Sequence, residues 1–185
     1  MLAGLQDRHF DFTDIERIIH LCGSFLTTRE GYVYLIHQSA KDYLTINASN
    51  TIFPAGPGPI HFNMFSRSCY ALSDTLQQDI YNLCHPGFPI DEVKEPNLDP
   101  LAAVRYSSVY WIDHFCQVED QSSKRKMALS DDGAVFSFFK KHFLHWLESL
   151  SLLHKVSDAI PSIRKLLHIV DVCLYLCHIL VGLEC

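Results

Sequence analysis

The sequence predicts a mainly α-helical protein, in which a short helix and a β-hairpin precede a larger helical bundle or arm. Three observations support this. Apolar residues recur every three to four positions over most of the chain, strand-forming residues flank one Glu-Gly pair, and a Pro/Gly run separates the two regions. The chain has 185 residues, 48% of them hydrophobic, so it can bury a substantial core.

The first element is a short helix with one apolar face. Thr13 and Glu16 have the spacing of a capping box, in which the threonine hydroxyl and the glutamate each satisfy a free backbone amide. Gly23 supplies a stop signal, which limits the helix to residues 14–22. The apolar face consists of Ile15, Ile18, Ile19 and Cys22.

A β-hairpin should follow this helix. Strand-forming residues occupy positions 25–28 and 32–36 on either side of Glu30-Gly31, and glycine accepts the positive φ that a tight turn requires. Ser39 can then cap a second helix, with Asp42 three residues further on. His37 lies at the change from strand to helix.

The prolines and glycines of residues 54–59 mark a rigid break between two regions. We therefore divide the chain into a truncated helix-and-hairpin part (1–52), a Pro/Gly linker (53–59), a helical arm (60–167) and an atypical apolar tail (168–185).

The helical arm begins with an amphipathic pattern over residues 62–83, which predicts about six helical turns. Asp99-Pro100 then has the signature of a helix start, with an acid at the N-cap and proline at the first position. The inner stripe of this next helix should contain Leu101, Val104, Ser108, Trp111 or Ile112, and Phe115.

The second half of the arm should contain a long helix after a polar linker. Within the linker, the run 124–126 (Lys-Arg-Lys) is typical of a solvated loop. Ser130 or Asp131 should cap the helix, which continues to Leu153, and a final pair of helices should be separated near Pro161. Core residues should include Trp111, Phe138, Phe139 and Trp146.

The composition argues against several classes of function. A formal net charge of -6 disfavours general binding to nucleic acid or anionic membranes. No lysine is followed by serine or threonine, so the chain alone cannot build a Walker phosphate loop, and the Rossmann pattern is absent. We therefore expect no catalytic residues and no enzymatic activity.

Cysteine usage and the apolar tail predict a cytoplasmic protein. The seven cysteines are odd in number and irregularly spaced, as expected of reduced thiols that pack as small hydrophobic groups. The apolar stretch 166–183 contains Asp171, which is costly in lipid, so a buried or partner-seeking helix is favoured over a membrane span. An exposed apolar stripe is expected at Leu174, Leu176, Ile179 and Leu180.

Histidine and cysteine pairs resemble metal ligands only superficially. His142 and His145 stand at i,i+3, and Cys173, Cys177 and His178 stand close together, but no second pair has zinc-finger spacing. We expect these residues to be structural and no metal to be bound.

A winged-helix DNA-binding protein is the alternative interpretation, because a helix followed by a hairpin is the arrangement of that motif. Base and phosphate contacts need Arg, Lys, Asn or Gln. The first helix instead offers Asp14, Glu16 and Arg17, and the hairpin adds only Arg29 beside Glu30. DNA binding is therefore the less favoured function.

Several blocks resemble, in order, the region that follows the nucleotide-binding core of fungal NACHT proteins of the vegetative-incompatibility type, which are NLR-like members of the STAND class of NTPases. The resemblance covers residues 13–167. It implies a partial winged helix followed by a helical arm that links the NTPase core to repeat domains. The blocks are CGSFLTTREGYVYLIHQSAKDYL, IFPAG, SDTLQQDIYNL, DPLAAVRYSSVYWIDHF and FLHWLESLSLL.

The resemblance also implies a role for His37. In STAND proteins a histidine just after the hairpin contacts the β-phosphate of bound ADP, and His37 matches that position, while Asp42 resembles the supporting acid. A helix start favours anions, so a ring donor there could lock an ADP-bound state that ATP would release. A purely structural role, in which His37 caps the hairpin or bonds a nearby carbonyl, is the alternative.

The family further implies which partners and cofactors to expect. We expect a fragment, because the NACHT core and the repeats have no counterpart in the sequence. ADP or ATP would then bind only when a NACHT core is joined to the chain. Its partners would be proteins, either that core or the repeat domains of a related full-length receptor, with neither nucleic acid nor membrane.

Overall fold

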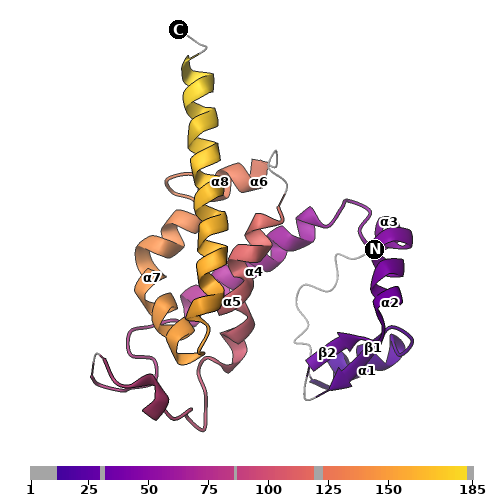
Figure 1. Cartoon of the computed structure of the whole chain (residues 1–185), viewed down its shortest axis with the longest axis horizontal. Helices are drawn as coiled ribbons and strands as arrows, with labels where there is room; N and C mark the ends of the chain where they lie inside the picture. The colour runs from indigo at the N-terminus through magenta and orange to yellow at the C-terminus, as the bar shows by residue number, and fades with distance from the viewer. Residues whose placement is uncertain (1–11, 30–31, 86, 119–122, 183–185) are drawn as a thin grey trace. The chain divides into compact units, whose positions relative to one another are not determined.

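The computed structural model describes residues 12–29, 32–85, 87–118 and 123–182. The chain divides into two compact units, residues 1–56 and residues 57–185 (Figure 1). The division between Gly56 and Pro57 falls inside the Pro/Gly segment, whereas the finer domain boundaries given above stay predictions. The fold is mainly helical with one two-stranded sheet, as the sequence predicts.

The first unit opens with a helix and a hairpin. Helix α1 (Phe12–Leu21) precedes the antiparallel strands β1 (Leu26–Arg29) and β2 (Tyr32–Leu35). Their register places Leu26 opposite Leu35 and Arg29 opposite Tyr32. Helix α1 begins at Phe12, so Thr13 lies inside its first turn and not before it, and the expected capping box is wrong.

Three short helical segments complete the first unit. Helix α2 (Gln38–Asp42) runs into the π-helical turn η1 (Tyr43–Asn47), and α3 (Ser49–Ile52) follows. The residue that caps α2 is His37 and not Ser39, so the predicted cap is shifted by two positions. The reason is that the His37 imidazole itself accepts from the Ser39 backbone amide.

The second unit is a bundle of longer helices. Helix α4 (Gly58–Thr75) packs along α5 (Arg105–Cys116), which also contacts α7 (Ala134–Leu152) and α8 (Val156–Gly182). Helix α6 (Ser123–Leu129) lies against α7. Two short 3-10 turns, η2 (Ile90–Glu92) and η3 (Ala102–Val104), lie in the connection before α5. In Figure 1 the yellow end of α8 continues beyond the other helices of this unit.

Aromatic side chains fill the core of the second unit. Trp111 and Trp146 pack edge to face with ring centroids 5.7 Å apart, and Phe65 and Phe115 lie 4.8 Å apart. The residues of the predicted inner stripe are buried, including both Trp111 and Ile112, but α5 begins only at Arg105, so Leu101 and Val104 lie before it. The fully buried large side chains are those of Phe65, Leu72, Leu101, Val104, Trp111, Ile112, Phe115, Trp146 and Leu150.

The first predicted helix of the arm ends early. Helix α4 stops at Thr75, whereas the apolar pattern predicted a helix to residue 83. Leu76 and Ile80 are buried as the pattern required, but from a loop. Asp79, Asn82 and Cys84 have positive φ angles, which break the helix, and the freed amides bond to carboxylates of Asp79 and Glu148 instead.

The polar linker also differs from the prediction. Residues 124–126 belong to helix α6, and Arg125 is buried with its guanidinium over the Phe115 ring, donating to the carbonyl of Val118. The expected solvated loop is therefore wrong. A run of charges in the sequence does not show that one of its arginines will find a backbone carbonyl and an aromatic ring to pack against.

The start of the long helix and the predicted break near Pro161 also differ from the structure. Helix α7 has Gly133 as its N-cap, while Ser130 donates to the Met127 carbonyl instead of capping it. Helix α8 is continuous through Pro161, so the expected helix pair is a single helix. Pro161 lies in the second turn of α8, and the hydrogen bond that it removes would have reached the carbonyl of Ser157, an exposed residue.

Within the described ranges we find no helix with the length and apolar character needed to cross a membrane. The expected apolar stripe at Leu174, Leu176, Ile179 and Leu180 lies outside the side chains that the structure describes.

Candidate functional site

His37 lies between β2 and α2, at the point where the backbone changes from extended to helical. Its own backbone is extended, with φ -151° and ψ 154°, and its side chain is exposed. The Nδ1 atom accepts from the Ser39 amide at 3.2 Å and lies 2.9 Å from the Ser39 hydroxyl. The local sequence produces this geometry because an imidazole two residues before an amide can act as a cap.

These contacts determine which ring nitrogen carries the proton. A backbone N–H can donate only to an unprotonated Nδ1, so the neutral imidazole of His37 holds its proton on Nε2. The capping role and an outward-facing donor are therefore compatible, because they use different nitrogens. The ring is exposed, so a group from another protein can approach the Nε2–H.

The structure does not pair Asp42 with His37. The Asp42 carboxylate accepts from the Gln38 side-chain amide over 2.9 Å, one helical turn earlier on α2. Gln38 was not singled out from the sequence, although its i,i+4 spacing to Asp42 is a recognisable helical signal. Asp42 thus contacts the residue that follows His37 and steadies the short helix that His37 caps.

The described side chains of the first unit form no buried core. Among residues 14–56 whose side chains the structure describes, none is buried. Phe25 and Tyr43 stack with ring centroids 6.0 Å apart, but large apolar side chains remain in water. Their exposed fractions reach 81% at Leu21 and 76% at Ile46, and the same group includes Ile18, Val33, Leu35 and Ile36.

The exposed charges of this unit are mixed. Arg17 and Arg29 are exposed, but Asp14 and Glu16 lie exposed on the same helix as Arg17. A surface that binds DNA needs several cations placed along a phosphate backbone. The helix and hairpin of a winged helix are present here, without a concentration of positive charge on the described residues of that helix.

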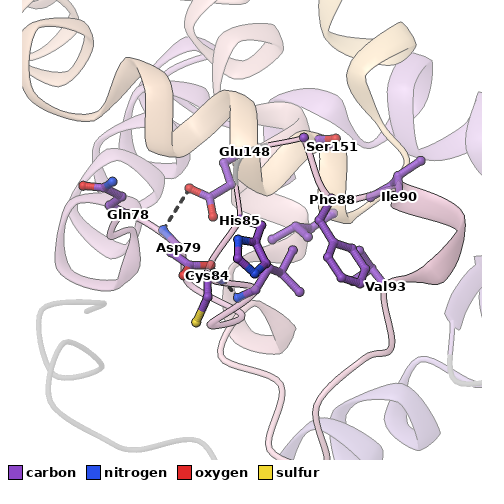
Figure 2. A pocket seen from close by; sticks show the side chains of 12 residues that line it. Gln78, Asp79, Cys84, His85, Phe88, Ile90, Val93, Glu148 and Ser151 are labelled. Atoms are coloured by element: carbon purple, nitrogen blue, oxygen red, sulfur yellow. Dashed lines mark hydrogen bonds between the residues drawn. The ribbon is translucent and has the colours of Figure 1, made fainter.

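A cavity of about 430 Å³ lies in the second unit beside the loop that follows α4 (Figure 2). Glu148 of α7 accepts from the amides of Asp79 and Ile80, both at 3.2 Å. Asp79 in turn accepts from the amides of Leu83 and Cys84, at 2.6 and 2.9 Å. Both carboxylates therefore hold the loop in place, and sequence reasoning missed them because each bonds backbone groups and not side chains.

Cys84 and His85 both line this cavity, but they do not form a nucleophile and base pair. The Cys84 thiol donates to the carbonyl of Asn82 at 3.5 Å and not to His85. An activated cysteine would need a base within hydrogen-bond reach and a group that orients the base. The cavity has the residue types of a catalytic site without the contacts.

The histidine pair on α7 is placed as a structural feature. His142 and His145 have ring centroids 6.0 Å apart, and the Nδ1 atoms of both are buried. Burial, with smaller effects from His145 and Lys141, lowers the pKa of His142. Among the residues that the structure describes, no group of three or more His, Cys, Asp or Glu is placed to hold a metal ion. The side chains of Cys173, Cys177 and His178 lie outside the described set.

Comparison with known proteins identifies a relative of this chain. The vegetative incompatibility protein HET-E-1 of Podospora anserina is 43% identical to this chain in an alignment 182 residues long, and the match covers 89% of the chain. The chain spans 13% of the length of that relative. No family model and no solved structure matches the chain. The match confirms the resemblance seen in the sequence: the chain is a relative of the fungal NLR-like vegetative-incompatibility proteins.

Proposed function

We propose that this chain is a non-catalytic regulatory segment of a fungal NLR-like STAND signalling protein, and that it relays the nucleotide state of a NACHT core to downstream repeats. The observation that supports this most directly is that none of the described side chains of the first unit is buried. Its apolar side chains, from Ile18 to Ile46, stay exposed while the second unit buries its own aromatic residues. Exposed apolar area of this kind marks a surface that another protein covers.

The first unit would be completed by the NACHT core, and His37 would face the nucleotide bound there. The outward Nε2–H would donate to the β-phosphate of ADP, and Asp42 would steady the helix through Gln38. A hydrogen bond to a charged group contributes about 1.5–3 kcal/mol. Exchange for ATP would disturb this contact, so the nucleotide would bias the unit between a docked and a released state.

The second unit would transmit this movement because it is internally rigid. Its helices share one aromatic core, and hydrogen bonds such as that from Trp146 to the Ser108 carbonyl cross between helices. A segment with a well-packed core moves as a body and does not bend. Its partners would be the NACHT core and the repeat domains of the full-length receptor, in the cytoplasm, without nucleic acid or membrane. No cofactor would bind this chain alone.

The test is ADP-dependent association with a separately expressed NACHT core from a related receptor. His37→Asn is the sharpest variant, because asparagine can still cap α2 but cannot place a donor where Nε2 lies. We expect it to weaken association with the ADP-loaded core by about tenfold, as loss of one charged hydrogen bond predicts. Fluorescence anisotropy of the labelled chain measures the affinity.

Two controls make this test specific. His20→Asn changes another exposed histidine of the same unit and should leave association unchanged. Circular dichroism should show equal helicity for both variants. Equal affinity of His37→Asn and the wild type for the ADP-loaded core would contradict the sensor role.

DNA binding by the winged helix is the second candidate, favoured by the presence of α1 followed by the β1–β2 hairpin. It predicts duplex affinity that falls steeply between 50 and 200 mM salt, roughly 10³-fold or more for six phosphate contacts. Neutralising Arg17 and Arg29 would then reduce the affinity. Salt-independent or undetectable duplex binding would exclude this function.

A further inference from the structure

A chain of three hydrogen-bonding side chains joins α4 to α5 within the second unit. The Nδ1 atoms of His61 on α4 and His114 on α5 lie 2.9 Å apart, and the imidazole rings have centroids 5.1 Å apart. On its other side, His114 Nε2 lies 2.6 Å from the hydroxyl of Tyr106, which stands two helical turns earlier on α5. Both histidines are half-buried.

The two Nδ1 atoms can share one proton but not two. In the neutral pair one Nδ1–H donates to the lone pair of the other, and the Tyr106 hydroxyl adapts by donating to or accepting from His114 Nε2. A single added proton leaves this arrangement intact, since one Nδ1 still accepts. When both rings are imidazolium, two N–H donors and two positive charges face each other at 2.9 Å, and the contact cannot form.

Among the residues that the structure describes, the charged groups acting on His114 supply no free counter-charge. The charged groups that act on His114 are His61 from α4 and Asp113 from its own helix. Asp113 is already committed to α8, where Lys165 Nζ contacts it at 2.9 Å and Ser162 donates at 3.2 Å. The Tyr106 hydroxyl also contacts His114, and it is neutral in this pH range.

We propose that His61, His114 and Tyr106 form a pH-sensitive clamp, which holds the first turn of α4 against α5 at neutral pH and releases it in mild acid. His61 lies three residues after the start of α4, where the second unit begins. The clamp therefore acts on the beginning of that unit. Release would loosen that end of the bundle while the Trp111–Trp146 core, further along, remains packed.

The direction of the pH effect agrees with this geometry. Burial, then the charge of His61, lowers the pKa of His114, and Asp113 opposes the shift. A group that binds a proton more weakly in the folded state stabilises the fold above its unfolded pKa, near 6.5. That stability is lost as the pH falls below this value, and the unfolding constant rises by at most about tenfold per pH unit for one proton.

Hydrogen exchange by mass spectrometry on the full chain tests the clamp where it acts. We expect amides of residues 58–65 to exchange at least severalfold faster at pH 5.5 than at pH 7.5 in the wild type, after correction for intrinsic rates. In His114→Gln the side chain cannot titrate, so exchange in this segment should be the same at both pH values. His61→Gln should behave alike, and His168→Gln, which changes an exposed histidine of α8, should behave as the wild type.

A second measurement keeps the inference testable if a variant fails to fold. Long-range proton–nitrogen correlation spectra of the wild type report which ring nitrogens carry protons at each pH. We expect the two Nδ1 atoms to share one proton above pH 6.5 and segment 58–65 to open as the second proton binds. Burial also lowers the pKa of His142, but His142 lies on α7. Its effect on exchange can therefore be distinguished from an effect in segment 58–65. Independent titration of His61 and His114, or exchange unchanged by pH, would overturn the clamp.

Discussion

Trp146 of α7 donates its indole N–H to the backbone carbonyl of Ser108 on α5 over 2.8 Å, within the fully buried core. The same indole packs edge to face against Trp111, so one side chain joins two helices by a polar and an apolar contact. We expect Trp146→Phe to lower the free energy of unfolding by about 2–4 kcal/mol, from the lost hydrogen bond and the space left behind. Urea denaturation followed by far-UV circular dichroism measures this.

The control for Trp146 is an aromatic residue of the same helix that faces water. Phe136 is 50% exposed, so Phe136→Leu should change the free energy of unfolding by less than about 1 kcal/mol. Equal effects of the two substitutions would contradict the assignment of Trp146 to the core.

Gly133 should not tolerate even a methyl group. A Cβ at this position would lie 2.4 Å from the Ala128 carbonyl oxygen and 2.5 Å from that of Met127, and both are backbone atoms that cannot move aside. We expect Gly133→Ala to destabilise the fold by about 1–3 kcal/mol through overpacking. Gly87→Ala is the comparison, since Gly87 has open space but a φ of +81°, and should cost only about 1 kcal/mol of backbone strain. The thermal unfolding midpoint should be highest for the wild type, lower for Gly87→Ala and lowest for Gly133→Ala.

Asp99 should make the stability of the second unit depend on acid pH. Its carboxylate accepts from the Tyr81 hydroxyl at 2.8 Å, from the Leu101 amide at 2.9 Å and from Arg105 Nη2 at 2.7 Å. Burial acts to raise the pKa of Asp99, but the hydrogen bonds from Arg105, Tyr81 and the Leu101 amide outweigh it, so the pKa is lowered. The ionised form therefore stabilises the fold above the unfolded pKa, near 3.8, and this contribution is lost as the pH falls below it.

The corresponding variant is Asp99→Asn. At pH 7 we expect it to destabilise the fold by about 1–3 kcal/mol, because the charged acceptor is lost. The difference from the wild type should shrink as the pH is lowered from 5 to 3, as followed by urea midpoints at each pH. Glu95→Gln, which alters the exposed partner of Arg105, should cost about 0–1 kcal/mol at every pH. A pH-independent difference for Asp99→Asn would show that its charge plays no part.

The thiols should differ widely in reactivity. Burial raises the pKa of Cys69 to about 12, so almost no thiolate forms near neutral pH, and the side chain lies in the core. Cys84 is exposed. At pH 8 we expect iodoacetamide to modify Cys84 readily and Cys69 only after unfolding, as peptide mass spectrometry can follow. Labelling of Cys69 at the rate of Cys84 in the native protein would mean that the core opens.

Much of this fold could be read from local patterns. The helix-then-hairpin start and the inner stripe of α5 followed from apolar spacing and one glycine, because these depend on neighbours a few residues away. His37 was found at a strand–helix junction, but its role as the cap of α2 was assigned to Ser39, since spacing alone does not show which side chain reaches the free amide. The contact of His37 with the β-phosphate of ADP stays a prediction.

What the sequence determined by itself was the periodicity, and hence which faces are apolar. Only the tertiary structure decided how polar groups are satisfied over long separations: the loop after α4 exists because Glu148, 69 residues away, accepts the Asp79 amide, and Arg125 is buried because Val118 offers it a carbonyl. The physical reason is that apolar burial is approximately additive along a helix face, whereas a buried hydrogen bond needs one particular partner, which folding alone brings into reach.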